Sequence, residues 1–288
     1  HLRRVAEVFA RRGPETACLQ GALDYYNWRS NPMARLFTLE YASWFRVLLP
    51  GLGRLGLALP LGGTTLFLRR EAIEAVGGWD AHNVTEDADL GIRLARQGYA
   101  TEMVAIATQE EANCRPWPWV RQRSRWLKGY AITWAVHMRD PRRLWRELGP
   151  RRFWGFQVLF LGTLTQFTLA PLLWSFWLVP LGLAHPLAPV LPGPALVALS
   201  ALFLLGQGLD LACAALGARR AGKGRLGLWA PLLPLYFPLA TLAVYRAWWE
   251  VAACPFRWDK TSHGLDPPVA AAVTPSPAPV ARRASAAS

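Results

Sequence analysis

The run Gln122-Arg123-Ser124-Arg125-Trp126 lies in a longer segment without Pro or Gly, and such a segment favours a helix. On a helix Gln122, Arg125 and Trp126 occupy positions i, i+3 and i+4, so an amide, a guanidinium and an indole share one face. This face suits a phosphorylated sugar, because Arg binds phosphate oxygens, Gln bonds hydroxyl groups and Trp stacks on a pyranose ring. A second interpretation stays open, in which a basic amphipathic helix lies on a membrane with Trp at the headgroups.

Composition divides the chain into a soluble part and an apolar part. The 288 residues are 52% hydrophobic, include 15 Trp and carry a formal net charge of +13. Residues 1–138 have the pattern of a soluble α/β domain, whereas 153–265 are rich in long apolar runs. The arginines cluster beside those runs, where they match lipid headgroups and membrane topology. We therefore expect a lipid bilayer as a partner and no nucleic acid.

The sequence contains no motif for a bound metal or a redox centre. Its 4 Cys residues stand singly and far apart, and its 5 His residues are scattered, so no pair has the spacing of metal ligands. We therefore assign no metal ligand within this chain.

Alternating helical and extended patterns in the first part predict an α/β layer. Apolar spacing and stop signals predict three helices, at Leu2–Arg12, Met33–Leu49 and Glu71–Val76. Short apolar runs predict three strands, at Ala17–Leu23, Thr64–Leu68 and Met103–Ala107. A further helix is predicted to run through Arg96 and end at Gly98, with Asn83 as its N-cap and Glu86 completing a capping box.

The second part predicts helices that cross a membrane. Residues 139–152 bring six arginines together with Trp145, which predicts an amphipathic basic segment at the membrane surface. The apolar runs that follow are Phe153–Leu183, Pro194–Gly217 and Leu226–Tyr245. They make three crossings, or a different number if the first run breaks at Pro171. Asp210 is the only charge in the second run, and we interpret it as a residue that snorkels toward a membrane surface. The Pro-, Ala- and Ser-rich stretch 266–288 predicts a disordered tail.

Thr85-Glu86-Asp87-Ala88-Asp89 places three carboxylates in the first turn of a predicted helix. Acids are favoured there for structural reasons alone, by capping and by the helix macrodipole. A catalytic role requires an acceptor hydroxyl close enough to one carboxylate to give up its proton. The turn Gly77-Gly78-Trp79-Asp80 and the helix after Trp117 are candidates for the walls of such a site.

Two motifs together carry a resemblance to a known family. Thr85-Glu86-Asp87, followed about 35 residues later by Gln122-x-x-Arg125-Trp126 and then by apolar helices, resembles the processive membrane glycosyltransferases of family 2. That family includes cellulose, chitin, hyaluronan and mannan synthases. Supporting matches are Gly62-Gly63-Thr64, Gly77-Gly78-Trp79-Asp80, Glu110-Glu111 and Trp258-Asp259-Lys260-Thr261-Ser262-His263-Gly264. The resemblance covers residues 1 to about 265.

By this resemblance the soluble part is the acceptor half of a GT-A domain, followed by α-helical transmembrane segments. Asp87 would be the general base that deprotonates the acceptor hydroxyl for in-line attack on the anomeric carbon, which gives inversion. Glu86 would help to shape the catalytic pocket. The residues implied to bind substrate are Gly63, Trp79, Asp80, Thr85, Gln122, Arg125 and Trp126. Lys260, Thr261 and His263 would belong to a late loop that closes over the nucleotide.

The resemblance also implies a donor-binding half in which an Asp-x-Asp holds a divalent cation, Mg²⁺ or Mn²⁺. Asp87-Ala88-Asp89 has that pattern but belongs to the Thr-Glu-Asp motif, so we expect the ligands of the cation to precede His1. We therefore expect this chain to be the C-terminal portion of the enzyme and inactive on its own.

The sequence thus predicts an inverting glycosyltransferase that takes a sugar from a UDP- or GDP-sugar. The acceptor would be a growing β-linked polysaccharide at the cytoplasmic face, and the spans of a multi-pass protein in the inner membrane would pass the polymer across. One alternative is a non-processive enzyme that glycosylates a lipid. Another is a non-enzymatic membrane scaffold with a degenerate transferase domain, although such a domain should have lost Asp87 or Arg125 and both are present.

Overall fold

The computed structural model describes residues 1–255 and 257. The predicted gating residues Lys260, Thr261 and His263, and the predicted tail 266–288, lie outside the described residues.

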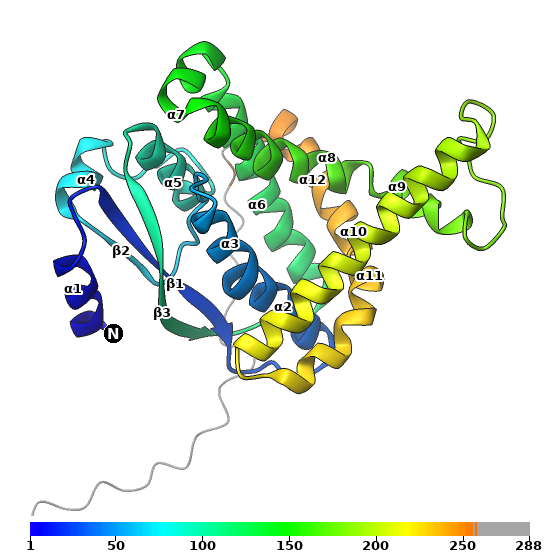
Figure 1. The fold of residues 1–288 in the computed structure, drawn as a ribbon, viewed down its shortest axis with the longest axis horizontal. Coiled ribbons are helices and arrows are strands. Elements are labelled where there is room, and N and C mark those ends of the chain that lie inside the picture. The colour runs from blue at the N-terminus through cyan, green and yellow to red at the C-terminus, as the bar shows by residue number, and fades with distance from the viewer. Residues whose placement is uncertain (256, 258–288) are drawn as a thin grey trace, which may run out of the picture.

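A small mixed sheet forms the centre of the first part (Figure 1). Its middle strand β1 (Thr16–Tyr25) pairs antiparallel with β2 (Leu66–Leu68) and parallel with β3 (Ala100–Glu110). Every residue of β1 is buried, including the polar Thr16, Gln20 and Asp24, as expected for the middle strand of a covered sheet. The predicted strands and the α/β class are therefore confirmed. β3 is longer than predicted because it pairs with β1 from Thr16↔Ala100 to Tyr25↔Glu110.

Helices surround this sheet and carry the chain into the apolar part. In the first part they are α1 (Leu2–Ala10), α2 (Pro32–Ser43), α3 (Leu49–Arg54), α4 (Arg70–Ala75), α5 (Glu86–Arg96) and α6 (Pro116–His137). A π-helical turn, Trp44–Leu48, joins α2 to α3. The four helices predicted before residue 99 and the helix predicted through Gln122 are therefore present.

The start of α5 differs from the predicted capping box. Thr85 is the N-cap, and its side chain makes no capping hydrogen bond. Asn83 lies two residues earlier, where its Oδ1 accepts from the Thr85 N–H at 3.0 Å and its Nδ2 donates to Thr133 Oγ1 at 2.8 Å. The capping-box assignment is wrong, because the Asn83 amide closes a local turn and bonds α6 instead.

Helix α6 lies inside the protein, between α5 and the last helix, α12 (Pro238–Ala253). Its Lys128 side chain is only 1% exposed and pairs with Glu250 of α12 at 3.1 Å. Glu250 also accepts from Arg246 Nε at 2.7 Å. Since protein covers several faces of α6, the interpretation of a helix lying flat on a membrane is not supported.

The described residues of the second part form helices joined by turns, with a non-helical stretch at 179–192. Its elements are α7 (Pro141–Phe156), a π turn (Gln157–Gly162), α8 (Thr163–Thr168), α9 (Ala170–Ser175), a 3-10 turn (Phe176–Leu178), α10 (Gly193–Arg220), a 3-10 helix (Gly224–Leu232), α11 (Leu233–Tyr236) and α12. These helices extend to one side of the sheet (Figure 1). The basic segment 139–152 forms the start of α7, which kinks at Gly149 with φ of 71°.

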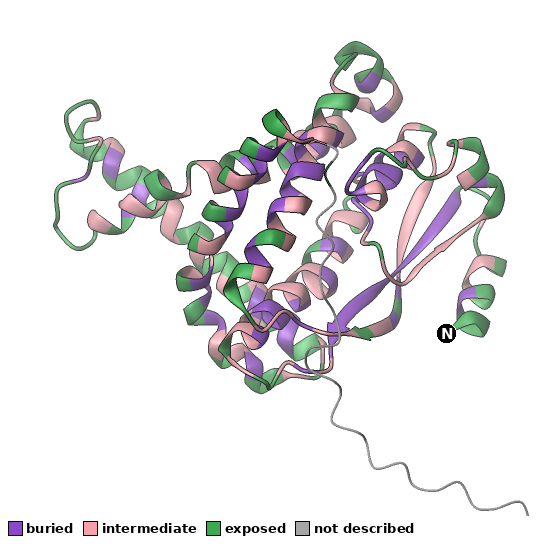
Figure 2. Cartoon of the chain, turned by 180° about the vertical axis from the view of Figure 1, so that it is seen from behind, coloured by how far each residue is buried: buried purple, intermediate pink, exposed green. Residues whose placement is uncertain are grey.

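Within the described residues, one helix is long and apolar enough to cross a membrane by itself, namely α10. Two bent pairs also pass if each counts as one span: 141–168 with 170–178, bent by 64°, and 224–236 with 238–253, bent by 48°. The first bend lies at Leu169, two residues before Pro171, as in the broken-run alternative. The outward side of α10 is exposed (Figure 2), with large apolar side chains at Val197, Leu202, Leu205 and Leu209.

Small residues allow α10 to pack closely on α2. Gly217, Ala214 and Ala218 are all buried. A Cβ on Gly217 would meet the carbonyl carbon and oxygen of Ala42 at 2.5 Å, so main chain touches main chain at this crossing. Backbone atoms cannot move aside as a flexible side chain can, and the crossing therefore requires glycine.

We predict that Gly217→Ala destabilises the protein by about 1–3 kcal/mol, because the added methyl overpacks the crossing of α10 and α2. Gly208→Ala is the matched control: it lies in the same helix and its Cβ would meet no atom within 4 Å. The control should be neutral or slightly stabilising, since Ala favours helix. Thermal unfolding of the purified protein in detergent distinguishes the two variants. Equal melting temperatures would contradict the close approach.

Candidate active site

A cavity of about 660 Å³ begins beside the first turn of α5 and extends between the apolar helices. The sheet side supplies the ends of β1 and β3 and the segment Gly62-Gly63-Thr64, while α2, α6, α8, α9 and α10 supply the other walls. Among the residues predicted from the sequence, those that line it are Gly63, Thr85, Glu86, Asp87, Gln122, Arg125 and Trp126. The structure thus brings the two sequence motifs to one cavity.

Asp87 lies at the wall of this cavity, in the first turn of α5. Its Oδ1 accepts a hydrogen bond from the Ala88 N–H at 2.7 Å. Gly63 packs against the other oxygen, since a Cβ on Gly63 would lie 3.1 Å from Asp87 Oδ2. Burial raises the pKa of Asp87 to about 6, although the N–H of Ala88 acts to lower it and the charge of Glu86 acts to raise it further. A carboxylate with this pKa is ionised near neutral pH and can accept a proton there.

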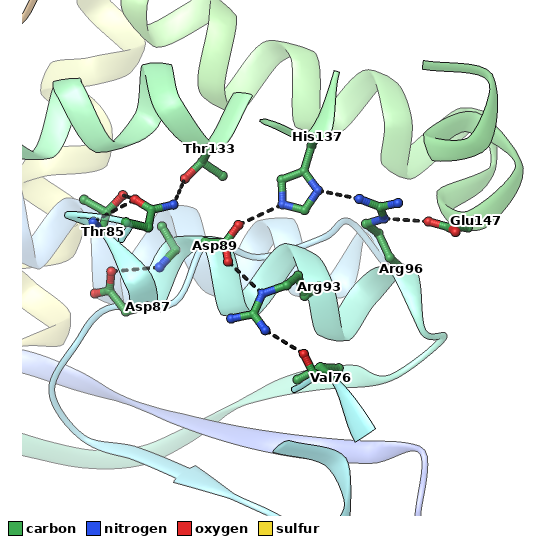
Figure 3. Close-up of polar contacts among 11 residues, drawn as sticks. Val76, Thr85, Asp87, Asp89, Arg93, Arg96, Thr133, His137 and Glu147 are labelled. Atoms are coloured by element: carbon green, nitrogen blue, oxygen red, sulfur yellow. Dashed lines mark hydrogen bonds and ion pairs between the residues drawn. The ribbon is translucent and has the colours of Figure 1, made fainter. Parts of the chain in front are cut away.

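The three acids of this turn do not form one cluster. Glu86 and Asp87 line the cavity, whereas Asp89 points away from it toward His137 and Arg93 (Figure 3). Burial acts to raise the pKa of Asp89, but hydrogen bonds from His137 and Arg93 outweigh it and the pKa is lowered. Asp87 and Asp89 therefore have opposite shifts in one helical turn.

The predicted face of α6 is turned toward the cavity. Gln122 lines it while its Oε1 accepts from Asn113 Nδ2 at 3.0 Å. Arg125 and Trp126 line it as well, and the Trp126 ring packs on Tyr41 of α2 with a centroid distance of 6.0 Å. An amide, a guanidinium and an indole thus line the same cavity as the Asp87 carboxylate. This arrangement can hold a hydroxyl-rich ring or a phosphate beside a base.

Arg123 is a site residue that sequence reasoning did not single out. Its guanidinium lies between the rings of Trp119 and Trp126, at 4.9 Å and 4.8 Å from their centroids. It also pairs with Glu40 of α2 at 2.6 Å. Arg123 therefore fixes the Trp126 ring from behind. Its spacing from two tryptophans, which lie at i−4 and i+3 on the helix, is the sequence signal that could have indicated this role.

Two predicted binding residues lie elsewhere. Trp79 and Asp80 do not line this cavity; Trp79 is 46% exposed, and Asp80 Oδ1 accepts from the His82 N–H at 2.9 Å. A role for them in substrate binding stays a prediction that the cavity does not support. Gly77 and Gly78 place them on a separate turn, with φ of 81° and 75°.

Polar residues also line the cavity between the apolar helices. Gln166 of α8 and Gln207 and Asp210 of α10 face it. On α10 the lining residues Phe203, Gln207, Asp210 and Ala214 are spaced four, three and four apart, which places them on one helical face. The interpretation of Asp210 as a snorkelling residue is therefore not supported.

Among the described residues, no three His, Cys, Asp or Glu side chains are grouped so that they could hold a metal ion. The carboxylate of Asp89 points away from the cavity that Glu86 and Asp87 line, so the three acids do not form one set of hard oxygen ligands for Mg²⁺ or Mn²⁺. The divalent cation expected for the donor remains a prediction from the resemblance.

Comparison with known proteins indicates one family for most of this chain. The model of "Glycosyl transferase family group 2" matches residues 1–206. A probable glycosyltransferase, YdaM of Bacillus subtilis, is 40% identical over 68 residues, which are 23% of this chain and 16% of YdaM. The UDP-forming cellulose synthase catalytic subunit of Komagataeibacter sucrofermentans is 31% identical over 150 residues, 51% of this chain and 18% of that protein.

An enzyme of glycolipid synthesis is similar to this chain at nearly the same sequence identity as the cellulose synthase subunit. The beta-monoglucosyldiacylglycerol synthase of Trichormus variabilis is 29% identical over 139 residues, 46% of this chain and 27% of the synthase. The matched regions thus span about a quarter or less of these relatives.

The raised pKa of Asp87 predicts that this carboxylate costs stability. Its unfolded-state pKa is near 3.8 and its folded-state pKa is about 6, so the folded protein binds the proton more tightly. Stability is therefore lost as pH rises from about 4 to 6 and stays lower above that range. We predict that Asp87→Asn raises the free energy of unfolding at pH 8 by about 1–3 kcal/mol.

The increase in the free energy of unfolding of Asp87→Asn should shrink as the pH is lowered through 6 and vanish near 4. Asp140→Asn is the matched control, because Asp140 caps α7 through the Arg143 N–H at 2.9 Å and Asn caps a helix equally well. Thermal unfolding at several pH values compares the two variants. A loss of stability in Asp87→Asn at pH 8 would show that the carboxylate has only a structural role at the helix start.

Proposed function

Because the chain belongs to glycosyl transferase family group 2, and is a glycosyltransferase, we propose that it transfers a sugar with inversion from a nucleotide-diphosphate sugar to an acceptor hydroxyl in this cavity. The observation that carries the proposal is Asp87: a carboxylate with a pKa of about 6 in the cavity that Gln122, Arg125 and Trp126 also line. The scaffold alternative is set aside, since the family match and both motifs favour an enzyme.

The proposed reaction needs one base and one leaving group. Asp87 takes the proton of the acceptor hydroxyl while the oxygen of that hydroxyl attacks the anomeric carbon of the donor sugar. The bond from that carbon to the β-phosphate oxygen breaks. The nucleoside diphosphate leaves with the electron pair of that bond, and the configuration at the carbon is inverted. Arg125 is suited to bind the negative charge on the leaving pyrophosphate, while Trp126 and Gln122 hold the acceptor sugar.

Smaller groups shape the space around the base. Gly63 leaves room beside the Asp87 carboxylate, where a side chain would crowd it. Glu86 lines the same wall and its charge adds to the raised pKa of Asp87. Thr85 is buried and positions the turn. We propose a UDP- or GDP-sugar as donor, which suits the relative named UDP-forming, with Mg²⁺ or Mn²⁺ bound by ligands other than the described residues.

We propose a growing β-linked polysaccharide as the acceptor. The support is the line of polar groups, Gln166, Gln207 and Asp210, that continues the cavity between the apolar helices. Amides and a carboxylate bond the hydroxyls of a sugar chain, whereas an acyl chain gains nothing from them. The outward apolar faces of α10 and the arginines of α7 suit a multi-pass protein of the cytoplasmic membrane, with transfer at the cytoplasmic face and the polymer passing outward.

A second candidate acceptor is a glycolipid. It is favoured by the similarity to a beta-monoglucosyldiacylglycerol synthase and by the apolar side chains of Phe167, Leu173 and Phe203 in the same cavity. In this case the sugar headgroup would lie beside Asp87 and the acyl chains along the apolar helices.

We predict that Asp87→Asn lowers sugar transfer by roughly 10²-fold or more, because the acceptor proton loses its base. The native protein in membrane vesicles is assayed with radiolabelled UDP- and GDP-sugars and Mg²⁺ or Mn²⁺. In the wild type, kcat/KM should fall as the pH drops below about 6, where Asp87 becomes protonated. Asp140→Asn serves as the control and should transfer at the wild-type rate. Transfer by Asp87→Asn at that same rate would refute the mechanism.

We predict that Gln207→Leu together with Asp210→Leu shortens the polymer and weakens an oligosaccharide acceptor by roughly 10-fold in kcat/KM, since two hydrogen-bonding groups of the cavity are lost. Leu209→Ala, on the exposed side of α10, is the control. The length of the radiolabelled products, separated by gel, is the measurement. A single added sugar on a lipid from the wild type would favour the glycolipid acceptor instead.

A further inference from the structure

One face of α6 holds the catalytic segment, which we define as residues 83–89. Gly129, Thr133 and His137 are spaced four residues apart, so they follow one another along that face. At its start a Cβ on Gly129 would meet Thr85 Oγ1 at 2.2 Å, so Thr85 lies directly on the helix backbone. One turn later Thr133 Oγ1 accepts from Asn83 Nδ2 at 2.8 Å.

The third contact of this face joins two buried side chains, those of His137 and Asp89. His137 Nε2 lies 3.0 Å from Asp89 Oδ1, and the side chains are 1% and 4% exposed. Asp89 Oδ2 accepts from Arg93 Nε at 2.7 Å, and Arg93 in turn donates to the Val76 carbonyl oxygen at 2.7 Å (Figure 3). Asp89 is therefore held on both oxygens, two residues after Asp87.

The hydrogen bond at Nδ1 of His137 determines which ring nitrogen carries the proton. Arg96 NH1 lies 2.8 Å from His137 Nδ1, and a guanidinium only donates hydrogen bonds. Nδ1 must therefore accept, which leaves the proton on Nε2, where it is donated to Asp89. Arg96 itself is held by Glu147 of α7 at 2.5 Å (Figure 3). A neutral imidazole is thus bonded to α5 at both nitrogens, to Asp89 at one and to Arg96 at the other.

We propose that His137 is a positioning residue for sugar transfer. As a neutral imidazole it holds Asp89 and thereby fixes the first turn of α5, with the Asp87 carboxylate, in register with the substrate face of α6. His137 does not line the cavity, so it acts through Asp89 and not on substrate. Through Arg96 and Glu147 this register is also joined to α7, the helix that carries most of the basic segment 139–152. The inference rests on the proposed role of Asp87.

The hydrogen bonds of His137 distinguish a positioning role from a role in packing alone. A residue needed only for packing is replaced by any side chain of similar volume, whereas this place requires a donor toward Asp89 and an acceptor toward Arg96. Glutamine carries both in one amide, with Nε2 as donor and Oε1 as acceptor, and leucine carries neither.

The test compares His137→Leu and His137→Gln in the native protein in membrane vesicles. We expect His137→Leu to lower kcat on the order of 10-fold or more with the donor KM nearly unchanged, since only the alignment of the base is lost. His137→Gln should recover most of the wild-type kcat. Backbone amides of residues 85–89 should exchange with deuterium faster in His137→Leu than in His137→Gln.

His185→Leu is the matched control, because His185 is 4% exposed, pairs with Ser175 Oγ at 2.9 Å and lies outside the cavity. It should keep the wild-type kcat. If His137→Leu fails to fold, Arg96→Leu at a half-buried position removes the partner of Nδ1, and it should show the same fall in kcat at constant donor KM.

The outcomes separate the two proposals. If Asp87→Asn is inactive while His137→Leu, or Arg96→Leu in its place, keeps the wild-type kcat, the positioning role is overturned and the base stands. If the Leu and Gln variants of His137 lose kcat equally, hydrogen bonding is not what the position supplies, and the positioning role is likewise overturned. Transfer by Asp87→Asn at the wild-type rate would remove the proposed function itself.

Discussion

The contact of Thr85 with the backbone of α6 at Gly129 is the constraint on which the site depends. With any Cβ at 129 the catalytic segment could not lie on the helix, because that atom would fall 2.2 Å from Thr85 Oγ1. Once the contact is made, helix geometry determines the rest. Gln122 lies seven residues before Gly129, about 10 Å along the axis, and the intervening turns direct Arg125 and Trp126 into the cavity. A single rigid helix therefore sets the distance between the base and the groups that would hold the sugar.

The same helix is joined to the apolar helices by charges that are costly to bury. Lys128 and Glu250 are almost fully buried, and Arg246 completes the group on Glu250. A buried ion pair contributes little net stability, since desolvation offsets most of the attraction, but breaking it leaves an unpaired charge in the interior. The pair therefore acts mainly to select one register between α6 and α12. The close crossing of α10 on α2 at Gly217 likewise allows only one register between those two helices, because the backbones fit together only where glycine leaves room. Together they keep the cavity continuous from the first turn of α5 into the apolar region.

The features that the sequence predicted correctly are those set by local periodicity. The buried run of β1, the helix through Gln122, Arg125 and Trp126, and the apolar length of α10 follow from spacing within a few residues. The errors concern partners that are distant in sequence. Asn83 has the spacing of an N-cap, but its Oδ1 accepts from the Thr85 N–H, and its Nδ2 is held by Thr133, fifty residues away.

Asp210 could not be assigned to the cavity without knowing which side of α10 faces α8, and β3 extends to Glu110 only because β1 pairs with it there.

Asp87 and Asp89 show why the structural explanation of acidic helix starts is incomplete here. Capping and the macrodipole act on both residues and should lower both pKa values. Asp89 behaves in this way, with His137 and Arg93 as partners, whereas burial beside the cavity raises the pKa of Asp87 to about 6. Within one turn the fold thus stabilises the charge of one carboxylate and leaves the other ready to accept a proton. Two acids driven apart in pKa by their surroundings are the pattern of a site in which one positions and the other reacts.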